Sequence, residues 1–322
     1  MFNFFKNPSW IDPRLLQEKK LDEIHPSFFE EINRGLSALQ SEDPLVSICI
    51  PAFNEETSIL RTLYSLSRSR TSYPVEIVVV NNNSSDRTQE VLDKLRVRAY
   101  FQPKPGWGPA RQMAQEKARG RYILSADADC IYPENWIQRM TEEIIKEGVS
   151  CVYGGYSFLA PFGKSRLSLV VYESLKNFIV ELRDIKRPWL NCGGASMGYV
   201  REMSLQIGFI DRRIRGEDGR MCFELAQRGK IVRVHGAIVW TSPRTLQKDG
   251  SLLRSFVNRF VSESKRLRSY FRPQPVHDTH TSKNFVHTSA ALNEMSPTIT
   301  PDVGENGGGN PQGVLKDPGT PK

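Results

Sequence analysis

Between residues 45 and 126, short apolar segments alternate with stretches of helical character, and this alternation restricts the chain to few folds. Four short segments predict strands, at residues 45–50, 75–80, 97–102 and 121–126, and the second of them is strongly β-branched. The stretches between them predict helices, at about residues 56–69, 87–95 and 109–120. Strands and helices that alternate at this spacing form a parallel sheet with helices on both faces. We therefore predict an α/β fold with a mostly parallel central sheet.

The rest of the chain continues this pattern less regularly. It predicts helices at residues 133–148, 167–183 and 219–228, and strands at residues 149–158 and 231–240. Residues 1–43 predict a helical N-terminal extension, and residues 249–272 predict a basic amphipathic helix. Residues 273–322 are rich in Pro, Gly, Thr and Asn and poor in large apolar residues, so we expect a disordered tail.

The composition is that of a globular protein, with 39% hydrophobic and 25% charged residues. The net charge of +8 favours an anionic partner: nucleotide phosphates, nucleic acid or an acidic membrane surface. The sequence has neither an apolar run of about 18 residues nor a basic segment followed by an apolar leader. We therefore expect no membrane-spanning helix and no secretory signal. The five scattered cysteines favour reduced thiols in the cytoplasm.

Polar clusters follow three of the predicted strands: Asn54-Glu55-Glu56, Asn81 to Asp86, and Asp127-Ala128-Asp129. In a parallel sheet all three lie at the edge where the carboxyl ends of the strands meet, which is where such sheets bind ligands. The Asn and Asp residues of the second cluster can recognise a base or a ribose, but they are equally common as turn and cap residues. Arg111, after the Gly108-Pro109 turn, can bind a phosphate or a base, or it can simply be solvated.

Asp127 and Asp129 are the candidate metal ligands. Two carboxylates one residue apart in a turn can converge on one hard divalent cation, such as Mg²⁺ or Mn²⁺, which also binds nucleotide phosphates. The alternative is a turn with two solvated acids. His235, on the last predicted strand, is a third candidate ligand, although a lone His on a strand is more often structural.

Glu217 and Asp218 form a second acidic pair at the start of a predicted helix. A carboxylate at this place can act as the general base for an acceptor hydroxyl. It can equally interact only with the helix dipole. Gly216 and Gly219 flank the pair and leave room for a ligand, which favours the functional interpretation.

Several motifs, taken in order along the chain, resemble those of family 2 glycosyltransferases. They are the opening strand at residues 46–56, the second strand and its loop at 76–88, the helix start at 108–111, the segment 120–129, the acidic pair 217–218 and the strand end at 239–244. The resemblance covers about residues 45–245. It implies a glycosyltransferase A fold with a Rossmann-like nucleotide-binding half, a nucleotide-sugar donor and a divalent metal, either Mn²⁺ or Mg²⁺.

The resemblance also implies roles for individual residues. Asp127 and Asp129 would lie at the nucleotide and the metal, with Asp129 the direct ligand, and Asp218 would deprotonate the acceptor hydroxyl and so invert the anomeric centre. The acceptor side would be formed by Glu217 and by the segment 191–197, which contains Gly193 and Gly194. The donor would be bound by residues that follow the first strands: Pro51, Ala52, Phe53, Glu55, Asn81, Asn82, Arg111, Asp127 and Ala128.

Two departures from the family pattern narrow the prediction. Asn81 stands where the family usually has Asp, which leaves the choice of nucleoside open. The Gln-x-x-Arg-Trp motif of the processive members is absent. We therefore expect the transfer of a single sugar rather than a synthase that polymerises and extrudes its product.

The segment 251–272 combines apolar residues at helical spacing with six Lys or Arg residues and one acid, Glu263. Such a helix can lie on an anionic bilayer surface, or it can pack on the domain with its basic face outward. No nucleic-acid-binding motif accompanies the charge, so we expect no nucleic-acid partner.

The combined prediction is an inverting, metal-assisted glycosyltransferase that moves one sugar from a nucleotide-diphosphate sugar to a glycan or lipid-linked acceptor in cell-envelope polysaccharide or glycolipid assembly. The catalytic domain would span residues 44–248, with a nucleotide-binding half at about 44–130 and an acceptor half at about 131–248. We expect the protein in the cytoplasm or peripherally at the inner face of the plasma membrane. Two alternatives are a sugar nucleotidyltransferase and a non-catalytic protein that binds nucleotide sugars or docks on membranes.

Overall fold

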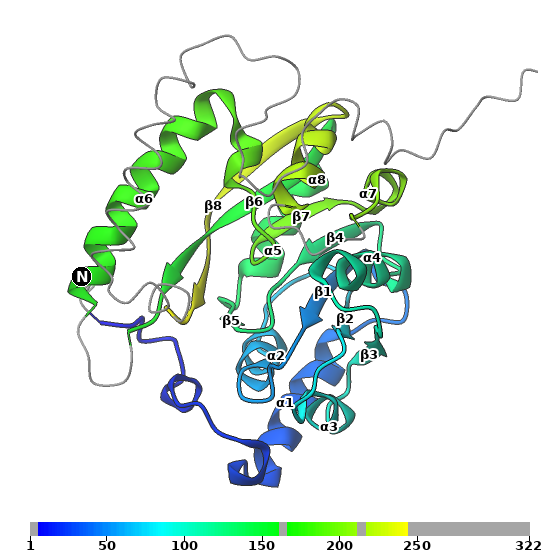
Figure 1. Ribbon diagram of the computed structural model, residues 1–322, viewed down its shortest axis with the longest axis vertical. Helices are drawn as coiled ribbons and strands as arrows, with labels where there is room; N and C mark the ends of the chain where they lie inside the picture. Colours follow the sequence, from blue (N-terminus) through cyan, green and yellow to red (C-terminus); the bar gives the residue numbers. More distant parts are fainter. Residues whose placement is uncertain (1–5, 161–165, 211–216, 244–322) are drawn as a thin grey trace, which may run out of the picture.

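A single sheet of eight strands runs through the part of the chain that the computed structural model describes, residues 6–160, 166–210 and 217–243 (Figure 1). The strand order is β3-β2-β1-β4-β7-β6-β8-β5. The strands are β1 (Val46–Ala52), β2 (Val75–Asn81), β3 (Arg98–Phe101), β4 (Tyr122–Ser125), β5 (Cys130–Ile131), β6 (Val149–Phe158), β7 (Met197–Val200) and β8 (Lys230–Thr241).

The first four strands form a parallel unit, because β1 pairs in parallel with β2 and β4, and β2 pairs in parallel with β3. Beyond β4 the direction changes: β7 is antiparallel to both β4 and β6. β6 and β8 are parallel again, and the two-residue β5 closes the sheet antiparallel to β8. The predicted α/β fold with a mostly parallel sheet is therefore confirmed.

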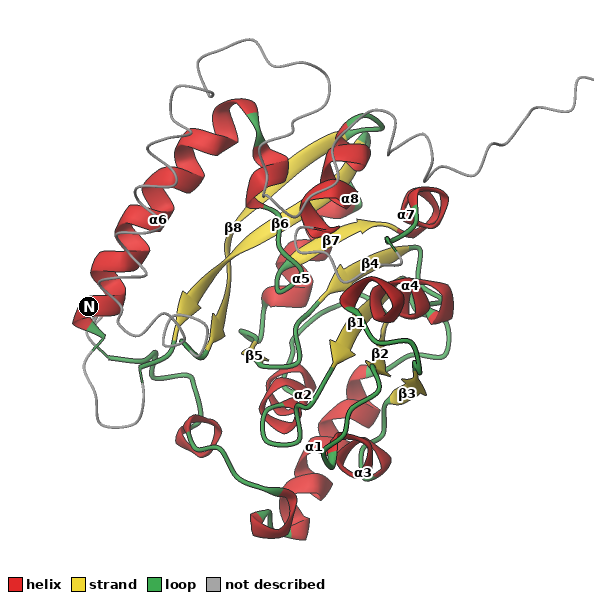
Figure 2. Cartoon of the chain, viewed as in Figure 1, coloured by secondary structure: helices red, strands yellow, loops and turns green. Residues whose placement is uncertain are grey.

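Helices cover both faces of the sheet (Figure 2). They are α1 (Pro26–Leu39), α2 (Ile59–Ser67), α3 (Thr88–Asp93), α4 (Trp107–Lys117), α5 (Trp136–Ile144), α6 (Leu167–Lys186), α7 (Arg201–Ile207) and α8 (Glu217–Ala226), with short 3-10 helices at Pro13–Leu16, Leu21–Glu23 and Pro188–Asn191. Successive residues of a strand point to opposite faces. On β1, Ile48 and Ile50 accordingly pack with α1, α2, α3 and α5, while Cys49 packs with α4 and α8.

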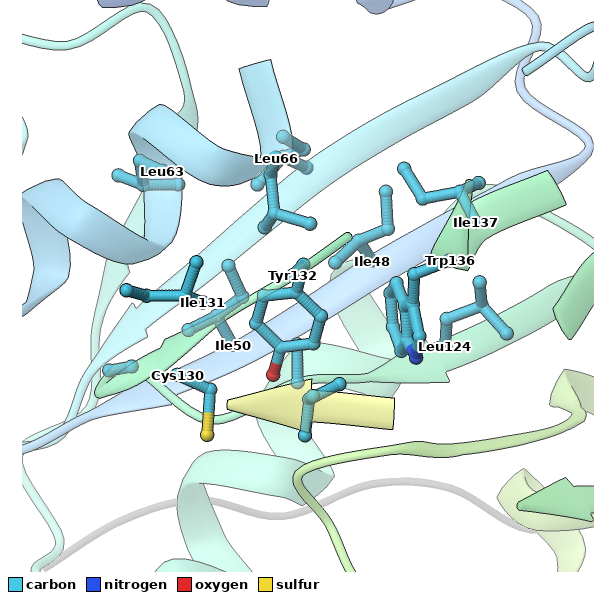
Figure 3. Packing of buried hydrophobic residues seen from close by; sticks show 14 of the residues in the cluster. Ile48, Ile50, Leu63, Leu66, Leu124, Cys130, Ile131, Tyr132, Trp136 and Ile137 are labelled. Atoms are coloured by element: carbon cyan, nitrogen blue, oxygen red, sulfur yellow. The ribbon is translucent and has the colours of Figure 1, made fainter. Parts of the chain in front are cut away.

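The larger core includes an aromatic pair beside β4, shown in Figure 3. Tyr132 and Trp136 are almost completely buried, and their ring centroids lie 4.6 Å apart in an edge-to-face arrangement. The buried polar atoms of both rings have partners, as such groups require. The Tyr132 hydroxyl donates to the carbonyl of Ala195 (2.9 Å), and the Trp136 Nε1–H donates to the Ser196 hydroxyl (2.9 Å). This pair therefore fixes the segment before β7 against α5.

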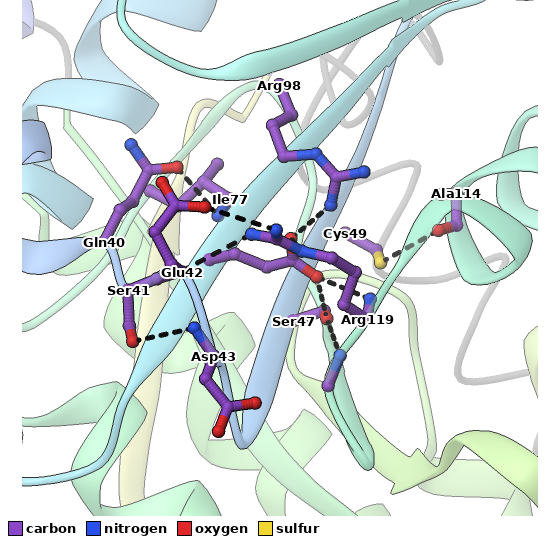
Figure 4. Close-up of polar contacts among 12 residues, drawn as sticks. Gln40, Ser41, Glu42, Asp43, Ser47, Cys49, Ile77, Arg98, Ala114 and Arg119 are labelled. Carbon is purple, nitrogen blue, oxygen red and sulfur yellow. Dashed lines mark hydrogen bonds and ion pairs between the residues drawn. The ribbon is translucent and has the colours of Figure 1, made fainter.

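A buried carboxylate ties together the amino ends of β1 and β2. Glu76 is 1% exposed and accepts hydrogen bonds from the Ser47 hydroxyl (2.6 Å), the Arg119 backbone N–H (2.6 Å) and the guanidinium groups of Arg119 (3.0 Å) and Arg98. Figure 4 shows Ser47, Arg98 and Arg119 converging from separate segments. Burial raises the pKa of Glu76, but these hydrogen bonds and the adjacent arginine charges outweigh it and lower the pKa below its usual range.

Three elements were not predicted from the sequence: β5, β7 and α7. β5 and β7 have two and four residues, and α7 has seven, so none is long enough to show a clear periodicity. The predicted helix at residues 133–148 is shorter than expected, because α5 spans Trp136–Ile144. The predicted basic helix at 249–272 and the tail at 273–322 lie outside the described residues.

The N-terminal extension is only partly helical, with two 3-10 turns before α1. α1 packs on the main core through Phe29, Ile32 and Leu36. At the other side of the molecule, α6 is the longest described helix (Figure 1). No helix among the described residues has both the length and the apolar character to cross a membrane.

Candidate active site

The three polar clusters lie at one edge of the sheet. Ala52 at the end of β1 is in register with Asn81 at the end of β2, and the Asn82 N–H donates to the Ala52 carbonyl (2.7 Å). On the other side of β1, the Ala126 N–H donates to the Cys49 carbonyl (3.0 Å), which places Asp127 just beyond the end of β4. The parallel unit thus presents all three clusters at its carboxyl edge, where such sheets bind ligands.

The loops that follow β1 and β2 are locked together by hydrogen bonds. The Asn54 N–H donates to the Ser84 hydroxyl (3.0 Å), and the Glu56 N–H donates to Oδ2 of Asp86 (3.1 Å). Asn54 and Asn83 both have φ near the left-handed region, at 54° and 55°, which Asn tolerates better than most residues. The side chains in these two loops therefore act largely as turn and cap groups.

The two asparagines proposed to bind the nucleoside differ in how many hydrogen bonds their side chains can still make to a ligand. The Asn81 amide is already used, because Nδ2 donates to Oε1 of Gln89 (2.8 Å) and Oδ1 accepts from the Ser84 N–H (3.1 Å). Asn82 donates from Nδ2 to the Gly106 carbonyl (2.6 Å), but its Oδ1 is buried with no hydrogen-bond partner among the described residues. Asn82 is therefore the better placed of the two to accept a hydrogen bond from a ligand.

The other residues proposed for the donor surround the end of β1. Pro51 is half-buried and Ala52 is buried, whereas the Phe53 ring is 49% exposed and is free to contact a ligand. Glu55 accepts a hydrogen bond from the Ser58 hydroxyl, which holds its carboxylate at the start of α2. Ala128 is buried in the turn after β4.

Arg111 connects the two acidic pairs. It lies on α4, is buried, and donates to the Ser125 hydroxyl at the end of β4 (2.5 Å). Its Nη2 lies 3.4 Å from Oδ1 of Asp127, and its Nε lies 3.4 Å from Oδ1 of Asp218. Burial lowers the pKa of Arg111, but the two carboxylates outweigh it and raise the pKa above its usual range. Arg111 therefore stays charged between carboxylates that are 91 residues apart in the sequence.

Gly194 has no side chain, and this allows Arg111 and Asp218 to come close to each other beside its backbone. Its N–H donates to Oδ2 of Asp218 (2.9 Å), so the carboxylate is held by Gly194 on one oxygen and faces Arg111 with the other. A Cβ atom added at Gly194 would lie 1.8 Å from Nη2 of Arg111, far inside van der Waals contact. Gly193 is different, because a Cβ atom there would meet nothing within 4 Å.

The turn after β4 brings Asp127 and Asp129 together. One carboxylate oxygen of each lies within 4.8 Å of the other and of the Cys130 sulfur. Two carboxylates at this separation fit the oxygen ligands that Mg²⁺ and Mn²⁺ prefer. Burial and the neighbouring Asp129 and Asp218 raise the pKa of Asp127 to about 7, although Arg111 opposes them. A divalent cation would favour the charged form of Asp127 and so reverse this shift.

Glu217 is buried beside Arg111, and neither of its carboxylate oxygens has a hydrogen-bond partner among the described residues. It packs against the start of α4, where a Cβ atom added at Gly108 would lie 2.8 Å from its Oε1. Burial, together with the charge of Asp218, raises the pKa of Glu217 to about 8. Glu217 is therefore mainly protonated at neutral pH, whereas Asp218, 25% exposed, is the member of the pair that a ligand can reach.

His235 is not brought to this site. Its side chain is exposed on β8, next to Gly236, which has a φ of 83° at a register shift of the β6–β8 pair. The β8 residue opposite Cys130 is Thr241, six positions further along, or roughly 20 Å of extended strand. A metal held by Asp129 is therefore out of reach of His235, and the expectation that His235 is a third ligand is withdrawn.

Tyr132 and Ser125 were missed by the sequence reasoning. The Tyr132 hydroxyl accepts from the Asp127 N–H (2.8 Å) and donates to the Ala195 carbonyl (2.9 Å), so it links the acidic turn to the segment before β7. Ser125 accepts from Arg111. A Tyr five residues after an Asp and a Ser in a strand are too common to be noticed without coordinates.

Comparison with known proteins identifies the class. A family model described as glycosyl transferase family 2 matches residues 47–207. Hyaluronan synthase of Pasteurella multocida is 34% identical over 81% of this chain and 27% of its own length. The putative teichuronic acid biosynthesis glycosyltransferase TuaG of Bacillus subtilis is 28% identical over 42% of this chain and 59% of its own length. The chain belongs to glycosyl transferase family 2, which confirms the predicted family and enzyme class.

Solved structures with a similar course of the chain are more distant in sequence. The mannosyltransferase PcManGT from Pyrobaculum calidifontis, solved with GDP-Man and Mn²⁺, aligns over 73% of this chain and 72% of its own, with a TM-score of 0.49 and 17% identity. Glucosyl-3-phosphoglycerate synthase from Mycobacterium tuberculosis, solved with Mn²⁺, UDP and phosphoglyceric acid, aligns over 76% and 84%, with a TM-score of 0.47 and 19% identity. This chain spans about a quarter of the hyaluronan synthase and 59% of TuaG.

Proposed function

We propose that the protein transfers a single sugar, with inversion, from a nucleotide-diphosphate sugar to a hydroxyl of a glycan or lipid-linked acceptor in polysaccharide or glycolipid assembly. One observation carries the proposal: Asp127 and Asp218 both lie 3.4 Å from the guanidinium of Arg111. The metal-binding candidate and the base candidate therefore belong to one site, which a donor diphosphate and an acceptor hydroxyl must share. The relatives named as polysaccharide synthases support the substrate class.

On the donor side, the residues that fit a divalent metal, Mn²⁺ or Mg²⁺, are Asp129 and Asp127. When bound, the metal would neutralise negative charge on the departing diphosphate. Arg111 supplies a fixed positive charge beside the same position, because it is buried and held by Ser125. Asn82 has a buried carbonyl oxygen available for a donor N–H or O–H group.

On the acceptor side, Asp218 takes the proton from the attacking hydroxyl. Its Oδ2 is held by the Gly194 N–H, and its Oδ1 faces Arg111, so the carboxylate has a fixed orientation. One direct attack on the anomeric carbon, opposite the departing diphosphate, inverts the configuration. Glu217 carries little negative charge at neutral pH, so it does not compete with Asp218 for the proton. Space beside Gly193 is open for the acceptor.

The test uses Asp218→Asn, Asp129→Ala and, as a control of the same charge change, Asp93→Asn on the exposed side of α3. We expect Asp218→Asn to lower turnover by about 10²–10⁴-fold, because a general base contributes about that much, while Mn²⁺-dependent binding of the nucleoside diphosphate is kept. Asp129→Ala should lose both turnover and Mn²⁺-dependent binding. Turnover is measured as released nucleoside diphosphate, and binding by isothermal titration calorimetry.

Full turnover in both site variants would contradict the proposed mechanism. Release of pyrophosphate instead of nucleoside diphosphate would identify a nucleotidyltransferase, and tight nucleotide binding without turnover of any donor would identify a binding protein. The donor base is found with a thermal-shift panel of nucleoside diphosphates with and without Mn²⁺, since a ligand that binds the folded state raises the melting temperature.

We also propose peripheral contact with an anionic membrane at its cytoplasmic face, through residues 251–272. These residues lie outside the described part of the chain. Their sequence supports the proposal, because it combines six basic residues with apolar residues at helical spacing. The described part adds an apolar stripe on α6: Leu167, Val171, Phe178 and Ile185 are exposed and fall within about 40° on one side of the helix.

Sedimentation with liposomes tests this contact. The protein should sediment with vesicles that contain phosphatidylglycerol at low salt and be released by high salt, because screening weakens the attraction. Replacement of the six basic residues in 251–272 by Gln should abolish sedimentation. A wild-type protein that stays in the supernatant at low salt would contradict the membrane proposal without affecting the proposed chemistry.

A further inference from the structure

Three cysteine side chains meet in the core on the α8 side of the sheet. Cys151 lies on β6, Cys192 follows the 3-10 helix Pro188–Asn191, and Cys222 lies on α8. Their sulfur atoms all lie within 4.8 Å of one another, and those of Cys151 and Cys222 are 3.4 Å apart. All three are free thiols; Cys151 and Cys222 are buried, and Cys192 is partly exposed.

A fourth sulfur belongs to the same cluster. Met197 on β7 is buried, and its Sδ lies 3.1 Å from the Sγ of Cys222. The chain has only 5 Cys and 7 Met residues, and the four sulfurs that meet here come from four separate parts of the fold. Packing alone asks only for small apolar side chains at such positions and gives no reason for sulfur to be collected at one point.

We propose that Cys151, Cys192 and Cys222, with Met197 as the fourth ligand, bind one thiophilic cation, and that the ligand set favours Cu⁺ over Zn²⁺. Three thiolates about 2.3 Å from one ion lie about 3.8 Å from each other. The sulfurs of Cys151 and Cys222 are 3.4 Å apart, and all three sulfurs lie within 4.8 Å of one another, so small shifts would bring them to this separation. A thioether is a ligand for Cu⁺ and only rarely for Zn²⁺. Each thiol that becomes a ligand releases its proton to water.

Binding here would fix the two segments that hold Asp218. Cys222 is one helical turn after Asp218 on α8, and Cys192 is two residues before Gly194, whose N–H binds the Asp218 carboxylate. An effect on turnover would rest on the proposed function. The binding of the cation does not, so it is measured first and on its own.

The experiment titrates the full-length reduced protein, without oxygen, with Cu⁺ buffered by bicinchoninate and separately with Zn²⁺. Stoichiometry is read by native mass spectrometry and stability by thermal shift. We expect one equivalent of Cu⁺ and a higher melting temperature. Cys192→Ser should lose binding, whereas Cys49→Ser, a buried cysteine outside the cluster, should keep it. Met197→Leu should weaken Cu⁺ binding at least tenfold and leave Zn²⁺ binding unchanged.

Cys192 is the least buried of the three, so its variant is the safest to fold, and circular dichroism verifies the fold of each variant. Failure of the wild-type protein to bind either cation, or equal loss of binding in Cys192→Ser and Cys49→Ser, would overturn the site. Binding of Zn²⁺ but not Cu⁺ would overturn the role of Met197. A protein that binds one equivalent of Cu⁺ but transfers no sugar would support this site while contradicting the proposed function.

Discussion

Two buried glutamates lie at opposite ends of the strands of the sheet, and they differ in their hydrogen-bond partners. Glu76, near the amino end of β2, accepts hydrogen bonds from Ser47, Arg98 and Arg119, and these lower its pKa. Glu217, beside the carboxyl edge, has no hydrogen-bond partner among the described residues for either oxygen, and its pKa is raised to about 8.

The difference separates a carboxylate that stabilises the fold from one that lies at the candidate site. A buried acid with all its hydrogen bonds made stabilises the native state, whereas a buried acid without partners destabilises it and is retained only for another reason. Perturbed acids of the second kind cluster at functional sites. Asp127 differs from Glu217 in having Arg111 as a partner, but its pKa is also raised, to about 7, and it lies at the same candidate site.

The largest stability effect is expected at Glu76. Glu76→Gln removes the charge that four donor groups of three residues share, and the Gln amide N–H₂ group faces at least one of them. We expect a loss of about 2 kcal/mol in the free energy of unfolding, less than for a fully buried ion pair because Arg98 and Arg119 are partly exposed and can be resolvated. Urea denaturation measures it, with the exposed Glu90→Gln as control. An equal loss of unfolding free energy in Glu76→Gln and Glu90→Gln would contradict the stabilising role of Glu76.

The two regions should also titrate in different pH windows. Because the pKa of Glu76 is lowered in the folded protein, Glu76 stabilises the fold at pH values above the usual pKa of a glutamate. This stabilisation is lost as the pH falls below about 4.5. The raised pKa values of Asp127 and Glu217 act in the opposite direction: between about pH 4 and 8 the unfolded chain has released protons that the folded one keeps. The stability of the metal-free protein should therefore fall as the pH rises through this window.

Thermal unfolding in EDTA at a series of pH values checks this expectation. The double variant Asp127→Asn, Glu217→Gln should lose most of the decline between pH 5 and 8 and keep the loss below pH 4.5. Mn²⁺ with a nucleoside diphosphate should raise the melting temperature more at pH 8 than at pH 5.5, because metal binding requires deprotonated carboxylates. A wild-type profile that is flat from pH 5 to 8 would contradict the assigned shifts.

The smallest effect is expected for Glu217→Gln. At pH 8.5 this variant should be more stable than the wild type by up to about 1 kcal/mol, because it removes an ionised group without partners. At pH 6, where Glu217 is already neutral, the difference should vanish. Urea denaturation at the two pH values measures it. A loss of stability as large as that of Glu76→Gln would show that Glu217 has partners after all, and the contrast would fail.

The strands and the position of the acidic turn were predictable because they depend on local sequence. A run such as Val75 to Val80 specifies a buried strand by itself, and the order of strands and helices then places Asp127 at the carboxyl edge. The junction at Arg111 was not predictable, because it joins α4 to α8 through residues 107 positions apart in the sequence. The role of Tyr132 and the collection of four sulfurs depend on tertiary contacts in the same way.

Gly194 carries a consequence for how this enzyme can change. Because the space of a single methyl group there is taken by Arg111, even alanine would push the guanidinium away from the carboxylate that Gly194 itself holds. At the acceptor site that we propose, a larger residue is therefore excluded at position 194. A side chain at position 193 would meet nothing within 4 Å, so substitutions that alter acceptor choice are expected at Gly193 and not at Gly194.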